Sequence, residues 1–294
     1  MGSEGMRSGS DYAASMPEDR PMRYALTVAN TGTYADPRVT VELAKAAEAS
    51  GWDGLFVWDH LAFVWGPPAA DPWVTLAAVA EATSSIRIGT AVTPVARRRP
   101  QVLAQQVATL DVLSGGRVVF GAGLGGAESE FGRFGEPVDA RVRAQMLDEG
   151  LDLLRRFWAG EEVRHRGTHY LVDGVTLAPL PVQERLPVWI GGNRPASLRR
   201  AARWDGWLAD SADPTGMTVS PDDVRTSLGA IRGARTSVEP FDVGVLGRSD
   251  RSDPASFADA GATWWVESVH DRRGPLERMR ELVAAGPRTQ RPTA

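Results

Sequence analysis

Short apolar segments alternate with longer amphipathic segments along most of this chain of 294 residues. The apolar segments are typical of buried strands, and the segments between them carry apolar residues at helical spacing. Parallel strands need a crossover between them, so strict alternation predicts a parallel sheet. The predicted strands are 23–30, 53–58, 86–92, 117–122, 187–191, 206–210, 241–246 and 262–267.

The predicted helices complete eight strand–helix units. The clearest places Leu147, Leu151 and Leu154 on one face. Eight units in roughly 260 residues fit a closed (β/α)8 TIM barrel, with an open doubly wound sheet as the alternative. The predicted helices are 37–50, 72–83, 100–114, 139–158, 195–204, 221–234, 254–260 and 275–284.

The alternation is interrupted between the fourth and fifth strands. Residues 160–187 contain Gly, Pro and aromatic residues without a clear period, so we expect an excursion, such as a hairpin. We predict a disordered extension over 1–21, the barrel over 22–284 and a flexible polar tail over 285–294. No apolar run reaches the roughly 18 residues of a membrane span, and the first residues lack a signal peptide's apolar stretch. We therefore expect a cytoplasmic protein.

Composition argues against several kinds of site. The chain has no Cys, which excludes disulfides, thiolate-bound metals and a cysteine nucleophile. Its net charge of -4 gives no basic field for nucleic acid. His165 and His169 are four residues apart, but Gly167 between them argues against the helix that would bring both to one metal ion. We therefore expect no metal site.

In a barrel of this kind, functional residues follow the carboxyl ends of the strands. Asp59 and His60 follow the second predicted strand, and a histidine can exchange a proton near neutrality. Adjacent strand residues point to opposite faces, so these two side chains need not touch. A lone histidine is also compatible with a purely structural role.

Two glycine-rich segments also follow predicted strands. Residues 121–126 match G-x-G-x-x-G, but a long predicted helix follows them where a dinucleotide site needs a second strand ending in an acid. They are either a flexible turn or a loop that lets the backbone approach a ring or a phosphate. Gly191 and Gly192 precede the helix at 195–204, an arrangement that favours an anion such as phosphate.

Four segments together resemble the bacterial luciferase-like superfamily of flavin- and deazaflavin-dependent oxidoreductases. The resemblance covers about residues 22–210 well and the remainder weakly. It implies a (β/α)8 barrel with an excursion that binds FMN or the deazaflavin F420 at the strand carboxyl ends. The segments are GWDGLFVWDHL, IRIGTAVTPVARRRP, LSGGRVVFGAGLGGAESEFGRFGE, and PVWIGG followed by RRAARWDG.

The resemblance also implies roles for single residues. The bond between Ala91 and Val92 matches a cis peptide that supports the ring, and His60 matches the proton-donating histidine of deazaflavin sugar-phosphate dehydrogenases. That branch has an acid directly after the glycine-rich loop, where this chain has Gly126, so sugar-phosphate oxidation is not expected. The other matched positions contact the ring and its chain (Asp59, Thr93, Gly125 and Ser129) or the phosphate (Gly191, Gly192, Ala196 and Ser197).

The function that this resemblance implies is hydride transfer between F420, or FMN, and a small organic substrate. Arg97 to Arg99 would then meet the acidic tail of F420, and Trp65 would lie in the loop beside the substrate. The alternatives are a monooxygenase that uses oxygen and reduced FMN, and a non-catalytic flavin-binding barrel. The expected partners are a separate flavin or F420 reductase and a second copy of the chain.

Overall fold

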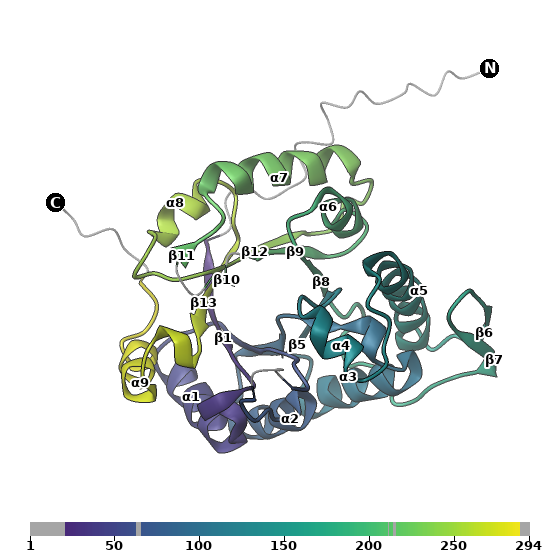
Figure 1. Cartoon of the computed structure of the whole chain (residues 1–294), viewed down its shortest axis with the longest axis horizontal. Coiled ribbons are helices and arrows are strands. Elements are labelled where there is room, and N and C mark those ends of the chain that lie inside the picture. The colour runs from purple at the N-terminus through teal and green to yellow at the C-terminus, as the bar shows by residue number, and fades with distance from the viewer. Residues whose placement is uncertain (1–20, 63–65, 211, 214–215, 289–294) are drawn as a thin grey trace.

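The computed structural model describes residues 21–62, 66–210, 212–213 and 216–288. Parallel strands form a ring in the order β3-β2-β1-β13-β12-β9-β8-β5, and pairing of β3 with β5 closes it (Figure 1). The predicted (β/α)8 barrel is confirmed. An open sheet is excluded, because such a sheet has two unpaired edge strands, whereas here β3 pairs with β5. The strands are β1 (Arg23–Val28), β2 (Gly54–Val57), β3 (Arg87–Thr90), β5 (Val118–Gly123), β8 (Val188–Gly191), β9 (Gly206–Ala209), β12 (Asp242–Gly247) and β13 (Trp264–Val269).

Helices cover the outside of this ring (Figure 1). Several of them begin with Pro, whose missing N–H costs no hydrogen bond in the first turn. Asp36, Asp71 and Asp139 cap α1, α2 and α5 by accepting backbone N–H groups. The helices are α1 (Pro37–Ala49), α2 (Pro72–Ala82), α3 (Pro100–Ser114), α5 (Ala140–Trp158), α6 (Pro195–Ala201), α7 (Pro221–Ala234), α8 (Pro254–Ala258) and α9 (Leu276–Ala284).

The excursion between β5 and β8 contains an antiparallel hairpin of β6 (Val163–Arg166) and β7 (Leu171–Val175), as predicted. It lies beyond α5, away from the barrel (Figure 1). Both histidines of the hairpin contact α5: His165 Nε2 lies 2.8 Å from Glu149 Oε1, and His169 Nε2 lies 3.3 Å from Gln145 Oε1. Among the described residues, no group of three His, Asp or Glu side chains is placed to hold a metal ion.

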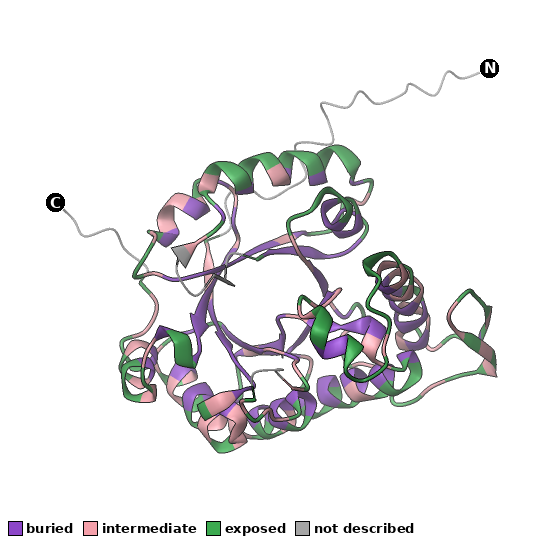
Figure 2. Ribbon diagram, viewed as in Figure 1, coloured by how far each residue is buried: buried purple, intermediate pink, exposed green. Residues whose placement is uncertain are grey.

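Inward side chains fill the barrel below the carboxyl ends of its strands. Phe56, Trp189 and Trp264 pack against one another: the Trp189 ring centroid lies 5.4 Å from each of the other two, which are 6.3 Å apart. The strands are accordingly buried throughout most of their length (Figure 2). The interior is therefore solid at this level, and any site lies above it. The inward cluster consists of Ala25, Phe56, Ala91, Val119, Trp189, Leu208, Leu246, Trp264 and Val266.

Several short elements near the strand ends were not predicted: β4 (Thr93–Pro94), α4 (Glu128–Gly132), β10 (Ala212–Asp213), β11 (Gly216–Met217) and the 3-10 turns η2 (Gly32–Ala35), η3 (Val95–Arg97) and η4 (Asp271–Arg273). Trp65 and nearly all of the predicted N-terminal extension lie outside the described residues. Of the predicted tail, residues 285–288 are described and follow α9. None of the helices in the described part combines the length and the apolar character that crossing a membrane requires.

Candidate functional site at the carboxyl ends of the strands

One wall of the barrel mouth is made of nearly bare backbone. It is formed by β3, β5 and β8, where glycines face inward around the side chain of Val92. A Cβ on Gly123 would lie 2.5 Å from Val92 Cγ2, and one on Gly191 would lie 2.9 Å from Val92 Cγ1. The Ala91–Val92 bond is cis, as the resemblance implies. We call these residues, Val92, Gly121, Gly123 and Gly191, the glycine wall.

His60 lies in the loop after β2, and its partner is a carboxylate from a distant loop. His60 Nδ1 is 3.0 Å from Glu130 Oε2 on α4, which follows β5. The neighbouring Asp59 forms its ion pair elsewhere, with Arg98. A carboxylate on Nδ1 favours the tautomer with the proton on that nitrogen and makes Nε2 the basic one. Glu130 therefore orients His60.

Glu130 is buried and held in place from several sides. Its Oε1 accepts the N–H groups of Leu61 and Ala62 at 2.6 and 3.0 Å, and Arg97 Nη2 lies 3.2 Å from its Oε2. Burial alone would raise the pKa of Glu130. The hydrogen bonds from His60 and Ala62 and the charges of His60 and Arg97 outweigh burial and lower this pKa to about 2. Glu130 is thus an anion at neutral pH.

Asn30, after β1, holds the backbone around His60. Its Nδ2 donates to the carbonyls of His60 and Ala70 at 2.8 and 2.7 Å, and its Oδ1 accepts the His60 N–H at 3.3 Å. The side chain of Asn30 therefore joins the start and the end of the loop after β2. This fixes the position of His60 from a neighbouring strand.

The arginine run is mostly engaged within the protein. Arg98 Nη2 lies 2.5 Å from Asp59 Oδ1, and Arg97 is paired with Glu130 and Glu136. The side chain of Arg97 is only 2% exposed. The expectation that the whole run meets an acidic cofactor tail is therefore wrong for Arg97 and Arg98. Of the run, only Arg99 is exposed.

The predicted phosphate loop has a defined shape but only part of the expected donors. Gly192 has φ +110°, and its N–H donates to the carbonyl of Leu208 at 3.1 Å. The prediction that the Gly192 amide receives a phosphate is therefore not supported. The amides of Ala196 and Ser197 lie in the first turn of α6, where a helix makes no intrahelical bonds.

The remaining predicted ring contacts differ in their surroundings. Thr93 is fully buried, and its hydroxyl lies 3.1 Å from that of Thr90. Gly125 has φ +75° and lies against Phe131 and Pro94. Ser129 is exposed on α4. Thr93 pairs with β5 and Gly125 follows it, so both lie beside the glycine wall, while the Thr93 side chain points into the protein.

Sequence reasoning missed His270, which follows β13 on the opposite side of the mouth. Its ring lies 5.6 Å from that of Trp58, and the Trp58 ring lies 5.9 Å from that of His60. The last predicted strand ended at 267, whereas β13 reaches Val269. Extending the predicted strand by two residues, to 269, would have placed His270 directly after the strand end.

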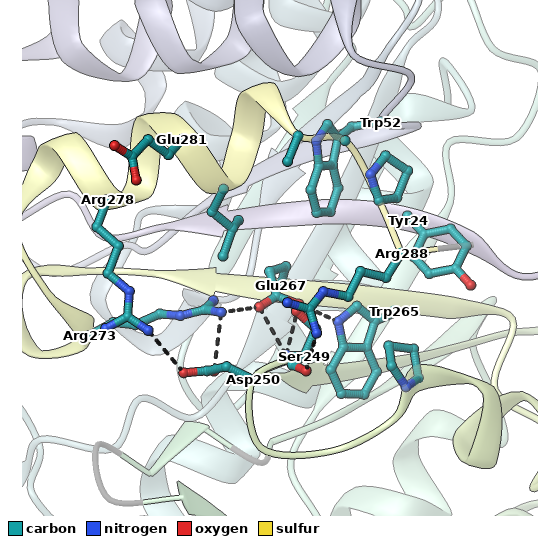
Figure 3. Close-up of a pocket in the computed structure, with 15 residues that line it drawn as sticks. Tyr24, Trp52, Ser249, Asp250, Trp265, Glu267, Arg273, Arg278, Glu281 and Arg288 are labelled. Carbon is teal, nitrogen blue, oxygen red and sulfur yellow. Dashed lines mark hydrogen bonds and ion pairs between the residues drawn. The ribbon is translucent and has the colours of Figure 1, made fainter. Parts of the chain in front are cut away.

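One cavity lies away from the mouth. It has a volume of about 350 Å3 and lies on the outside of the barrel, between β13, α9 and the loop after β12 (Figure 3). Glu267 forms its base: Oε2 accepts from Trp265 Nε1 at 2.6 Å, and the carboxylate pairs with Arg273. Arg273 also pairs with Asp250 at 3.2 Å. Glu267, Arg273 and Asp250 neutralise one another, so they form a structural ion-pair network that lines this cavity.

Comparison with known proteins gives a consistent family. Residues 22–248 match the family described as luciferase-like monooxygenase. An F420-dependent glucose-6-phosphate dehydrogenase of Microbacterium testaceum is 38% identical over 186 residues, 60% of this chain and 54% of that protein. F420-dependent glucose-6-phosphate dehydrogenase 2 of Rhodococcus jostii is 35% identical over 257 residues, 82% and 74% of the two chains. The chain spans about half the length of several curated relatives that it matches.

Solved structures share the fold. An F420-dependent secondary alcohol dehydrogenase in complex with an F420-acetone adduct superposes with a TM-score of 0.73 at 19% identity, covering 91% of this chain and 99% of that one. Monooxygenase RslO1 from Streptomyces bottropensis superposes with a TM-score of 0.65 at 27% identity, covering 76% and 70%. The first of these similarities extends through almost the whole described barrel.

Proposed function

The chain belongs to the luciferase-like monooxygenase family, and from this premise we propose that it is an oxidoreductase that transfers hydride between F420 and a small organic substrate. The observation that carries the proposal is the His60–Glu130 pair, 3.0 Å apart, at the same barrel mouth as the glycine wall. The names of the curated relatives favour F420 over FMN.

The residues present fit a flat ring with a phosphate-bearing chain. In the glycine wall the Val92 side chain packs closely against the backbone of Gly123 and Gly191, because neither residue has a Cβ in that space. The first turn of α6 offers the amides of Ala196 and Ser197 to a phosphate. These residues would hold F420 or FMN.

F420 bound there would accept a hydride from the substrate or return one to it. Oxidation of an alcohol also releases a proton from its hydroxyl. His60 Nε2 takes this proton, because the bond from Nδ1 to Glu130 makes Nε2 the basic nitrogen. Glu130 stabilises the imidazolium that forms, and Asn30 holds the backbone of the loop that carries His60 in place. Reduction of a carbonyl uses the same groups in reverse.

The test is an anaerobic titration with F420 and with FMN, followed by cofactor fluorescence. The expected result is that F420 binds and that His60→Ala lowers turnover about 100-fold or more while the cofactor Kd stays within several-fold, since general acid–base catalysis contributes about that much. Asn at position 60 is the matched control for side-chain volume. Full activity of His60→Ala would show that His60 is structural.

The similarity to monooxygenase RslO1 supports a second candidate, a monooxygenase that uses oxygen and reduced FMN. Oxygen consumption with supplied reduced FMN would favour it. Oxidation of reduced F420 without oxygen uptake would reject it. The third hypothesis is a non-catalytic barrel. It would be supported if the protein binds the cofactor but no substrate accelerates the oxidation of the bound cofactor.

The proposal includes the setting in which the protein works. We place it in the cytoplasm, as a homodimer, with a separate F420 or flavin reductase as the source of reduced cofactor. The family match supports the need for a supply of reduced cofactor. Light scattering of the purified protein measures the dimer directly.

A further inference from the structure

We propose that the wall opposite the glycines receives an uncharged oxygen of the substrate, a hydroxyl or a carbonyl on an otherwise apolar molecule, and not a phosphate or carboxylate. This wall consists of Thr27 on β1, Trp58 after β2, and Ser268 and His270 at the end of β13. We call these four residues the β13 wall. The inference names the substrate class and rests on the proposed function for the reaction itself.

The direction of these side chains follows from the alternation along each strand. Trp264 and Val266 belong to the inward cluster, so Ser268 and His270 continue the same face toward the mouth. Ala25 and Phe56 are also inward and place Thr27 and Trp58 on that face. In the ring of strands, β13, β1 and β2 lie across from β5, β8 and β9 (Figure 1).

Three polar atoms of this wall have no hydrogen-bond partner. They are Thr27 Oγ1, Ser268 Oγ and His270 Nδ1, and all three residues are at most 6% exposed. Thr27 is the register partner of Ser268 on the neighbouring strand. Strand spacing then puts the backbone of Ser268 about 5 Å from that of Thr27 and about 7 Å from that of His270. A buried polar group without a partner costs stability, so a cluster of them at a barrel mouth marks a place where a ligand supplies the partner.

These groups are suited to an uncharged partner. Two are hydroxyls, and the third is an imidazole that is neutral at physiological pH: burial and the charges of Arg248, Arg273 and Arg272 lower the pKa of His270 to about 4, against the opposing effect of Asp271. A neutral imidazole has one donor and one acceptor nitrogen, as a hydroxyl or carbonyl needs. The Trp58 ring beside it offers apolar surface.

Four arginines that follow β3, β12 and β13 pair with carboxylates. Arg98 pairs with Asp59, Arg97 with Glu130, and Arg248 and Arg273 with Asp250. A phosphate dianion needs cations that are not already neutralised, because its desolvation must be offset by charge-assisted bonds. Of the exposed arginines, Arg133 and Arg194 follow β5 and β8 on the glycine side, whereas Arg272 lies in η4, two residues after His270.

The experiment compares two probes that share a ring and differ in charge, cyclohexanol and cyclohexyl phosphate. The full-length protein is labelled with 15N-histidine, and the imidazole signals are followed by NMR, without and with F420. The His270 signals are assigned by comparison with His270→Gln. We expect cyclohexanol to shift the His270 signals and cyclohexyl phosphate to leave them unchanged. A shift from the phosphate ester, or no shift from the alcohol at tens of millimolar, would overturn the inference.

Variants separate a binding role from a structural one. His270→Leu should raise the KM for cyclohexanol about tenfold with a smaller change in kcat, because one hydrogen bond is lost. His270→Gln, which keeps a donor and an acceptor, should recover most of that loss. His169→Leu, on the hairpin, is the matched control and should change neither. Equal KM values for all four proteins would contradict the assignment.

This design keeps the two proposals apart. If F420 fails to bind, the proposed function is wrong, while the probe titrations without cofactor still report on the β13 wall. If F420 binds and glucose 6-phosphate is oxidised with a kcat/KM equal to or above that of cyclohexanol, the function stands and the substrate class is wrong. We expect the neutral alcohol to be preferred by at least about 100-fold, the effect of two or so lost charge-assisted bonds.

Discussion

Glu130 is a charge that the protein has desolvated and then stabilised. Two backbone N–H groups, His60 and Arg97 surround the carboxylate. Burial alone would raise the pKa of Glu130, but its surroundings lower it to about 2. Glu130 is the second acid after Gly126 in the sequence, and nothing in its local pattern marks it as a partner of His60. Contact between loops 70 residues apart depends on how the barrel brings β2 and β5 together, which no local pattern reveals.

Replacing Glu130 by Gln tests this role. Gln keeps oxygen for the N–H groups of Leu61 and Ala62 but removes the charge that stabilises the His60 imidazolium. We expect kcat to fall about 10- to 100-fold, the range of second-sphere partners, with an unchanged cofactor Kd. Steady-state kinetics and fluorescence titration measure the two quantities. Glu128→Gln is the control, because Glu128 is exposed on the same helix. Equal losses in both variants would argue against the pair.

His270 gives the fold a specific sensitivity to acid. Its folded pKa of about 4 lies below the ordinary value of 6.5, so the unfolded chain binds a proton first as the pH falls. The contribution is therefore complete above pH 6.5 and is lost as the pH falls toward 4. The charged groups around it are Arg248, Asp271, Arg272 and Arg273.

We expect the Tm of the wild-type protein to drop between pH 6.5 and 4 and that of His270→Gln to drop less. Glu130 acts in a different pH window. Because its folded pKa is lowered from 4.5 to about 2, its contribution to stability is lost as the pH falls from 4.5 to about 2. Thermal unfolding followed by circular dichroism at half-unit pH steps separates the two. Parallel curves for both proteins would show that other groups cause the acid loss.

The strands and long helices could be predicted from the sequence, because each is long enough for its buried apolar residues to show the spacing of a strand or a helix. β5 is buried at every position, and α5 places Leu147, Leu151 and Leu154 on the barrel. α4 has five residues, too few for a helical period, and its Phe131 is fixed by tertiary contacts with Arg97 and Arg143. The elements that build the scaffold were thus predictable, and the short elements that carry the site were not.

The glycine wall makes a prediction at the level of the sheet. In Gly123→Ala the new Cβ would lie 2.5 Å from Val92 Cγ2, so Val92 must move into the space assigned to the cofactor ring. We expect the F420 Kd to rise at least about tenfold, since overpacking costs roughly 1–3 kcal/mol.

Two variants sharpen this test. Gly126→Ala is the control, because nothing lies within 4 Å of its Cβ position. Adding Val92→Ala to Gly123→Ala restores the space and should recover part of the affinity. Fluorescence titration gives all four Kd values. An unchanged Kd in Gly123→Ala would remove this wall from the cofactor site.

At the scale of the whole molecule, the first strand of the barrel pairs with the last one. β13 pairs with β1 over six residues, and α9 covers the seam beside α1. Glu267 lies on the outer face of β13, 1% exposed, and bonds to Trp265 Nε1, the Ser249 N–H and Arg273. The outer ion-pair network thereby ties β13 to the loop after β12 and to η4.

Removing one member of this network should weaken the closure of the whole ring. Glu267→Gln leaves Arg273 buried with less compensation, and breaking a buried pair costs about 3–5 kcal/mol of unfolding free energy. Urea unfolding measures the loss, and one cooperative transition with an unchanged m-value is expected because closure belongs to the entire barrel. Glu281→Gln, on α9 at the same cavity, is the exposed control and should lose less than about 0.5 kcal/mol. A second transition that releases α9 alone would show that the network holds only that helix.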